Sequence, residues 1–157
     1  MLAAACDLRI ASEDARFSIP EVELGIPLAW GGIPRLVREI GPAMTKELVM
    51  TCRQFTPQEA QAMRFVNRVV PFDELDQHVE QLAAEIIRMP SVPVVITKEH
   101  VNAVSRAMSA GLTSFADGEA LLSTIADPES VQARNDYMFR LRKKSDQSGS
   151  DEDLAKK

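Results

Sequence analysis

Hydrophobic residues recur at helical spacing along most of the chain, and this pattern predicts a mainly helical structure. Only three short segments have the apolar character of strands, at 8–11, 15–19 and 66–70. Strands this few and this short do not make a self-sufficient sheet. Helices are predicted at the opening 1–5, over 33–40, from Met44, from Pro57, and over 75–86, 94–108, 112–125 and 128–141.

Glycine and proline set the boundaries between these segments. Their density over 20–34 is typical of an ordered loop. The run Thr56-Pro57-Gln58-Glu59 is a strong helix start, because it combines a capping hydroxyl, a first-turn proline and a capping-box glutamate. We therefore expect a part that holds the strands (1–70), a helical part (71–144) and a polar tail (145–157) that is disordered.

The composition is that of a soluble globular protein, with 45% hydrophobic and 26% charged residues. A net charge of -5 makes nucleic acid an unexpected partner, because binding to phosphate backbones needs basic surface. No apolar run approaches the roughly 20 residues of a membrane span, and no signal peptide opens the chain, so membranes are not expected as partners either. The expected compartment is the cytoplasm, or the mitochondrion if a targeting segment lies upstream.

The residues available for metal binding are few. Two cysteines and two histidines, Cys6, Cys52, His78 and His100, lack the spacing of a disulfide framework or a metal site. We therefore expect no metal.

Glu21 is the most unusual polar residue of the loop, because Phe17–Pro27 surrounds it with apolar neighbours. Desolvation there would penalise the charged carboxylate, which suits a group that takes up and releases protons as a general acid or base. The alternative is that Glu21 caps a turn or points to water, as most glutamates do. The residues alone favour this alternative.

Other candidates carry weaker signals. Gly31 and Gly32 precede a helix and would present amide donors to an anion, although a steric requirement of the turn explains them equally well. Trp30 would either wall an apolar pocket or simply pack. On the last predicted helix, Lys143 belongs to a short basic cluster that either docks on the core or presents cations to a phosphate-bearing ligand.

The order of several motifs resembles the crotonase (enoyl-CoA hydratase/isomerase) family from Met1 to about Lys144. The motifs that carry the resemblance are Ala5-Cys6-Asp7-Leu8-Arg9-Ile10-Ala11, Ala15-Arg16-Phe17-Ser18-Ile19-Pro20-Glu21, Leu24-Gly25, Gly31-Gly32 with Arg35-Leu36, Ile40-Gly41, the Thr51-to-Ala62 helix start, Val66-Asn67-Arg68-Val69-Val70 and Thr97-Lys98-Glu99.

The resemblance implies an α/β fold that is mostly helical in this chain: part of a ββα spiral followed by a C-terminal helical region that forms homotrimers or homohexamers. It also implies an acyl-CoA substrate whose thioester oxygen is held by two backbone amides as an enolate forms. CoA is part of that substrate, so no separate cofactor is expected. Glu21 matches the second catalytic glutamate of the hydratases. The expected substrate-binding residues are Pro20, Ile26, Leu28, Trp30 and Gly31, and Lys143 is expected to bind the CoA part.

The chain departs from the family pattern in two places. The first glutamate of the hydratases would fall near Met1, and the glycine-rich oxyanion turn would precede it. We therefore expect this chain alone to be nearly inactive, since losing one oxyanion donor costs about 10²–10³ in rate. The loop Ile26-Pro27-Leu28-Ala29-Trp30-Gly31-Gly32 carries larger residues than the usual form, which would reshape the acyl pocket. A non-catalytic oligomerisation module is the alternative.

Overall fold

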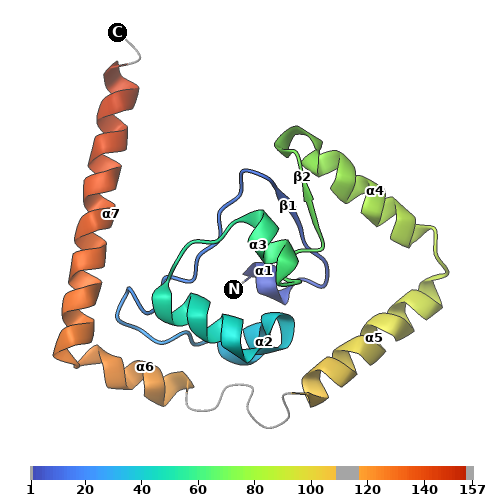
Figure 1. Ribbon diagram of the computed structural model, residues 1–157, viewed down its shortest axis with the longest axis horizontal. Helices are drawn as coiled ribbons and strands as arrows, with labels where there is room; N and C mark the ends of the chain where they lie inside the picture. The colour runs from blue at the N-terminus through green and yellow to red at the C-terminus, as the bar shows by residue number, and fades with distance from the viewer. Residues whose placement is uncertain (1, 109–116, 155–157) are drawn as a thin grey trace.

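The computed structural model describes residues 2–108 and 117–154. Figure 1 shows a small core built by the first half of the chain, with the later helices arranged around it. The elements are α1 (Leu2–Ala5), β1 (Ile10–Ser12), α2 (Gly32–Thr51), α3 (Pro57–Ala62), β2 (Arg68–Val70), the 3₁₀ turn η1 (Phe72–Glu74), α4 (Leu75–Ile87), α5 (Ser91–Ala107), α6 (Asp117–Ile125) and α7 (Pro128–Leu154).

The helices predicted from the hydrophobic pattern are confirmed, with some changes at their ends. The two helices predicted on either side of Gly41-Pro42 form one element, α2, which is kinked where Gly41 takes a non-helical conformation (φ 79°, ψ 166°). Proline removes an amide donor, so the interruption lies where the sequence placed its stop signal. Of the predicted helix 112–125, residues 112–116 lie outside the described residues.

Two predictions of local structure were wrong. Segment 15–19 is not a strand, and only Phe17 forms an isolated antiparallel bridge, with Phe55. The last helix was expected to end near Leu141, but α7 continues to Leu154. Residues 155–157 of the expected tail lie outside the described residues, and its disorder stays a prediction. No proline follows Pro128, so every later residue of α7 retains the amide donor that helical hydrogen bonding needs.

β1 and β2 pair in parallel, with Ala11 opposite Val69. A reciprocal clasp precedes this pair. The Arg9 amide donates to the Asn67 side-chain oxygen (2.8 Å), and the Asn67 amide donates to the Arg9 carbonyl (2.8 Å). These two hydrogen bonds join the residues just before β1 and β2, and so fix the start of β1, next to α1.

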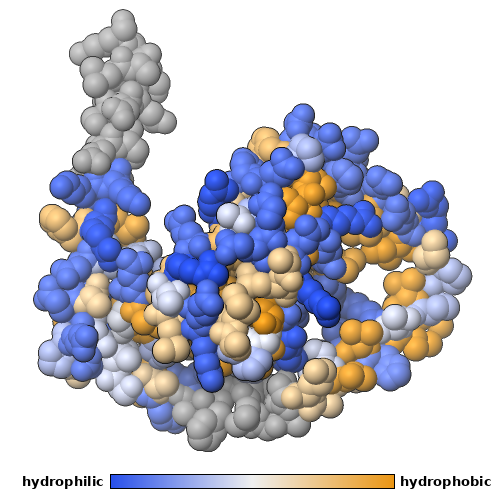
Figure 2. Space-filling model, viewed as in Figure 1, coloured by the Kyte–Doolittle hydropathy of each residue, from blue (hydrophilic) through white to orange (hydrophobic). Residues whose placement is uncertain are grey.

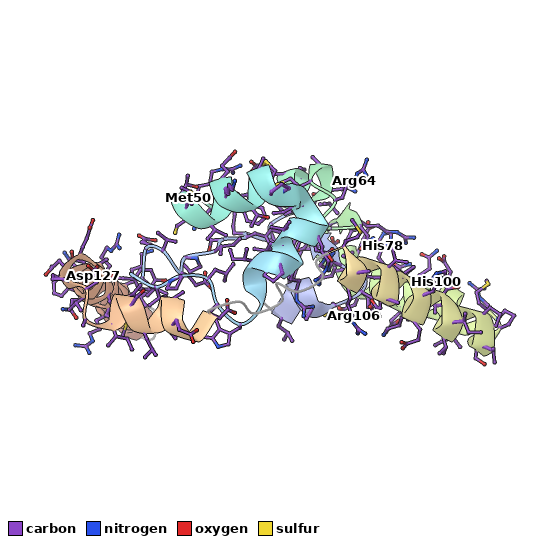
Figure 3. All side chains as sticks on the ribbon, turned by 90° about the horizontal axis from the view of Figure 1, so that it is seen from below. Met50, Arg64, His78, His100, Arg106 and Asp127 are labelled. Carbon is purple, nitrogen blue, oxygen red and sulfur yellow. The ribbon has the colours of Figure 1, made fainter. Side chains whose placement is uncertain are left out.

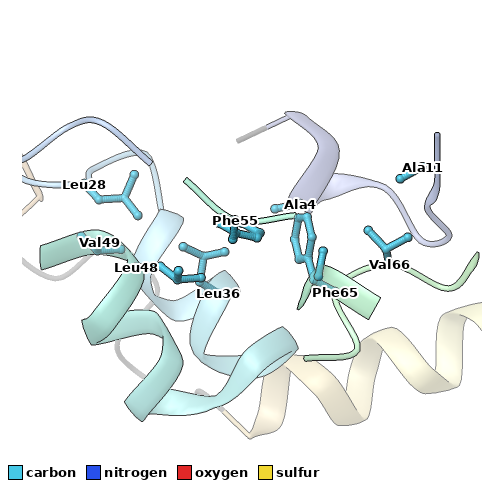
Figure 4. Close-up of a cluster of buried hydrophobic side chains, with 10 residues drawn as sticks. Ala4, Ala11, Leu28, Leu36, Leu48, Val49, Phe55, Phe65 and Val66 are labelled. Atoms are coloured by element: carbon cyan, nitrogen blue, oxygen red, sulfur yellow. The ribbon is translucent and has the colours of Figure 1, made fainter. Parts of the chain in front are cut away.

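The hydrophobic core lies between α1, α2, α3 and the two strands (Figure 4). Leu48 is completely buried in it. Phe17 stacks on Phe55 at 5.3 Å between ring centroids and meets Phe65 edge to face at 6.1 Å. The segment predicted as a second strand is thus held by aromatic packing together with the backbone bridge from Phe17 to Phe55. The buried members are Ala4, Ala11, Leu28, Leu36, Leu48, Val49, Phe55, Ala60, Phe65 and Val66.

The predicted capping box at the start of α3 is confirmed. The Glu59 amide donates to the Thr56 hydroxyl oxygen (3.1 Å), and the Thr56 amide donates to the Glu59 carboxylate (2.9 Å). The bond from the Thr56 amide, followed by the bond from Arg53, lowers the pKa of Glu59. The capping box therefore satisfies two of the backbone amides that have no partner within the helix.

We expect Thr56→Ala to lower the free energy of unfolding by about 1 kcal/mol, since it removes the hydroxyl that accepts from the N3 amide. Urea denaturation followed by circular dichroism measures this loss. Gln58→Ala is the matched control, because Gln58 is exposed in the same helical turn. Equal losses in the two variants would contradict a specific role for the cap.

α4 and α5 form an arm that leads away from the core (Figure 1), here called the α4–α5 arm. Val101 and Val104, which share one apolar face of α5, are 62% and 53% exposed. The reason is that the arm extends around one side of the core and a cavity separates the two. Figure 2 shows hydrophobic residues at the surface of this arm. Other large exposed apolar side chains on it are Val79, Ile86, Ile87, Met89, Val92, Val95 and Ile96.

Candidate functional site

The segment Pro20–Gly31, here called the Glu21 loop, begins with a tight turn. The Glu21 carbonyl accepts hydrogen bonds from the amides of Leu24 (3.0 Å) and Ile26 (3.0 Å), and the Pro20 carbonyl accepts from Leu24 (3.1 Å). Gly25 takes a positive φ of 68° at the end of the turn. The loop is therefore ordered by its own backbone, as its proline and glycine content predicted.

The Glu21 carboxylate is partly withdrawn from water. Its Oε2 atom is buried and has no hydrogen-bond partner among the described residues, where it is the only carboxylate oxygen of this kind. A buried polar atom without a partner costs free energy, so such atoms are rare unless a ligand, water or function accounts for them. The prediction that Glu21 stands in apolar surroundings is consistent with this burial.

The end of the loop is conformationally strained. Trp30 has φ 57° and Gly31 has φ 65°, both in the left-handed region. That region costs a residue with a side chain about 1–2 kcal/mol, and strained residues of this kind cluster at functional sites. Trp30 is 67% exposed, so it does not pack in this chain as a lone tryptophan usually does. Its exposed ring leaves open the predicted role as a wall of the substrate site.

The Gly31 amide, which the sequence suggested as an anion donor, already has an acceptor. It donates to Oδ2 of Asp117, the first residue of α6, at 2.9 Å. Gly31 is the N-cap of α2, where the helix dipole favours a negative group. The carboxylate that occupies this position therefore comes from 86 residues further along the same chain.

Two further contacts join the Glu21 loop to α7, whose first turn lies at the corner with α6 that Asp127 marks in Figure 3. Arg140 pairs with Glu23 at 2.9 Å. Gly25 lies directly against the first turn of α7, since a Cβ added there would be 2.2 Å from the Ser130 carbonyl oxygen. Hydrogen bonds from Ser130 to Asp127 cap this turn and lower the pKa of Asp127.

The other predicted site residues lie in different surroundings. Ile26 is half-buried within the turn. Leu28 is buried in the core (4% exposed) and packs against Gly32, where an added Cβ would lie 2.8 Å from Leu28 Cγ. Leu28 therefore anchors the loop to the hydrophobic core. Lys143 is exposed on α7, three residues beyond Arg140, and the structure shows no contact between it and the loop that would test its predicted role.

A cavity of about 280 Å³ lies beside the start of the loop, between α1, α2 and the aromatic cluster. Ser18 and Ile19, next to Pro20 in the chain, form part of its wall. It is at the lower limit of the range for ligand sites. A larger cavity of about 960 Å³ lies between the core and the α4–α5 arm. The linings of both cavities include none of the predicted site residues. The smaller cavity adjoins the first residue of the Glu21 loop, so we assign the candidate site to this cavity and the loop.

Among the side chains described for residues 2–108 and 117–144, no group of three or more His, Cys, Asp and Glu lies close enough together to hold a metal ion. His78 and His100 both lie on the α4–α5 arm (Figure 3). Over the same residues, no helix is long and apolar enough to cross a bilayer.

The chain matches the family model described as "Enoyl-CoA hydratase/isomerase" over residues 1–147. It is 45% identical over 100 residues to a short-chain-enoyl-CoA hydratase from Clostridioides difficile, with 64% of each chain covered. Among solved structures, it resembles an enoyl-CoA hydratase from Mycobacterium smegmatis (TM-score 0.72, 26% identity, 79% of this chain and 56% of that one).

It also resembles a methylmalonyl CoA decarboxylase (TM-score 0.75, 25% identity, 87% of this chain and 54% of that one). The chain spans about half the length of the curated relatives it matches. The resemblance seen in the sequence motifs is thereby confirmed, and so is the partial spiral fold. Because the match spans nearly the whole chain, this protein belongs to the enoyl-CoA hydratase/isomerase, or crotonase, family.

Proposed function

We propose that the chain carries one half of an enoyl-CoA hydratase site, in which Glu21 is the acid/base for an acyl-CoA thioester. The observation that carries the proposal is the buried, unpartnered Oε2 of Glu21 on an otherwise hydrogen-bonded loop. The relatives named as enoyl-CoA hydratases support the substrate class. Hydration is the reaction we favour within the family.

The proposed chemistry needs one proton transfer at each end of the double bond. The water oxygen adds to the β carbon of the enoyl thioester, and a proton reaches the α carbon. The Glu21 carboxylate takes a proton from the attacking water. The carboxylic acid formed in this step then gives a proton to the α carbon. Apolar surroundings keep competing water away from that proton, so the loop both orients and shields the group.

The proposed site is incomplete within this chain. The resemblance assigns two amides that would stabilise the enolate oxygen to segments before Met1, and each such donor contributes about 10²–10³ in rate. We therefore propose that residues 1–157 alone turn over an acyl-CoA only very slowly. CoA would approach along the basic side of α7, where Lys143 lies.

A second candidate function is a non-catalytic assembly module. The observation that favours it is the exposed apolar surface of the α4–α5 arm, since surfaces of this kind mark interaction sites. We propose that this arm mediates a homotrimer or homohexamer in either case. Under the second candidate, assembly would persist without any turnover.

The deciding experiment compares the native protein with residues 1–157 alone. Intact mass and N-terminal sequencing define the native species, and loss of crotonyl-CoA absorbance measures hydration by both. We expect hydration by a native protein longer than this chain, and a rate at least about 10²-fold lower for the chain alone. A native product that begins at Met1, assembles and shows no turnover would contradict the proposed enzyme activity and support the non-catalytic assembly module.

A further inference from the structure

The Glu21 loop is held from outside by α6 and α7 at three separate points. Asp117 accepts from the Gly31 amide at 2.9 Å, Arg140 pairs with Glu23 at 2.9 Å, and Ser130 lies against Gly25. In Figure 1 the loop reaches from the core toward the corner between α6 and α7. These contacts come from a part of the chain at least 86 residues distant, so α6 and α7 add outside support to the hydrogen bonds of the loop's own backbone.

The three contacts differ in strength. The Arg140–Glu23 pair is exposed on both sides, so its contribution is small. The Ser130–Gly25 contact is steric and sets how close α7 lies. The Asp117 bond joins a carboxylate to a half-buried amide at a helix N-terminus, and charge-assisted bonds of this type are the strongest of the set.

The Asp117 bond also lies at the most strained part of the loop. Its donor, Gly31, follows Trp30, and both residues are in the left-handed region. Strained backbone persists only when neighbouring groups determine its conformation. Asp117 is the side chain that reaches this point from outside the loop. α7 in turn holds α6, because Arg134 donates to the Thr124 carbonyl (3.3 Å).

We propose that Asp117 is a positioning residue of the candidate site: its bond to the Gly31 amide makes α6 and α7 a clamp on the Glu21 loop. This inference rests on the proposed function for the role of Glu21, but the clamp itself is independent of turnover. The conformation of the strained Trp30 and of its neighbour Gly31 depends on the clamp, and these two residues connect the Glu21 turn to α2.

Trp30 makes the clamp measurable, because it is the only tryptophan of the chain. In the 157-residue chain, hydrogen exchange of peptides covering 20–33 and the fluorescence anisotropy of Trp30 both report the order of the loop. We expect Asp117→Ala to speed exchange at 29–33 by about 10- to 100-fold, the effect of losing a hydrogen bond to a charged group. Anisotropy should fall with it.

Two variants separate positioning from a general loss of structure. Asp117→Asn keeps an acceptor oxygen in place and should restore most of the protection. Glu119→Ala removes the same charge from the same turn of α6, where Glu119 is exposed, and should change neither signal. Should alanine at 117 unfold the chain, Asp117→Asn against Glu119→Gln still decides, since only the first should raise exchange at 29–33, by a few fold.

Exchange that is unchanged in Asp117→Ala, or raised equally throughout the chain, would overturn the clamp. In a native protein with hydratase activity, Asp117→Ala should lower kcat more than it raises KM, and asparagine should recover kcat. If Glu21→Gln has no effect on that rate, the proposed function fails while the exchange result still stands on its own. If the Asp117 variants change neither exchange nor rate while Glu21→Gln lowers the rate, the clamp is contradicted and the proposed function is supported.

Discussion

Glu21→Gln should reduce the hydration rate of the native protein by about 10²–10⁴-fold, the usual contribution of a positioned acid or base. Glutamine has nearly the same shape and fills the same place in the loop, but it neither accepts nor returns a proton. KM should change little, because the carboxylate is proposed to act on the attacking water. The measurement is kcat and KM from the loss of crotonyl-CoA absorbance.

Glu23→Gln is the matched control, two residues further along the same loop. The Glu23 side chain is 41% exposed and is paired with Arg140 of α7. Breaking an exposed ion pair changes stability by at most about 1 kcal/mol, so the rate should stay within about threefold of the wild type. A Glu21→Gln variant that keeps more than a tenth of the activity would remove the carboxylate from the mechanism.

The contrast between the two glutamates shows what burial adds to a motif. Residues alone left Glu21 more consistent with a turn cap than with a catalytic group, and the family resemblance changed that assessment. The structure adds a physical reason, because Oε2 of Glu21 is buried without a partner among the described residues, whereas Glu23 has one. A desolvated carboxylate gains more from a bound water or substrate than a solvated one does.

Local signals in the sequence predicted local structure well. The capping box at Thr56, the stop at Gly41-Pro42 and the ordered loop after Pro20 each depend on residues within one or two turns of each other. The end of α7 was harder to predict, because polar composition favours disorder while the absence of a further proline permits a helix. Whether such a segment is helical or disordered depends on the sum of small free-energy contributions from each of its residues.

Contacts between distant segments had no signal in the pattern. Asp117 lies inside the helix predicted over 112–125, and nothing in the neighbouring sequence indicates that its carboxylate accepts a hydrogen bond from the Gly31 amide. The same limit applies to Phe17, which was expected in a strand and instead packs on Phe55 and Phe65. Val101 and Val104 have the spacing of a buried face, but periodicity does not say which partner covers it.

Gly25→Ala should be among the most destabilising substitutions in the loop. A residue with a side chain pays about 1–2 kcal/mol in the left-handed region, where Gly25 has φ 68°. The new Cβ would also lie 2.2 Å from the Ser130 carbonyl oxygen, which belongs to helical backbone and has little freedom to move. Adding the usual cost of overpacking, we expect the free energy of unfolding to fall by about 2–4 kcal/mol in urea denaturation.

Gly118→Ala is the control that isolates this contact. Gly118 lies in the first turn of α6, and a Cβ added there meets no atom within 4 Å. Alanine should therefore stabilise the helix by up to about 1 kcal/mol. Changes of opposite sign in the free energy of unfolding for the two substitutions would show that α7 contacts the Glu21 loop directly. If Gly25→Ala were tolerated as well as Gly118→Ala, α7 would not lie against the loop in solution, and the clamp would lose its steric contact.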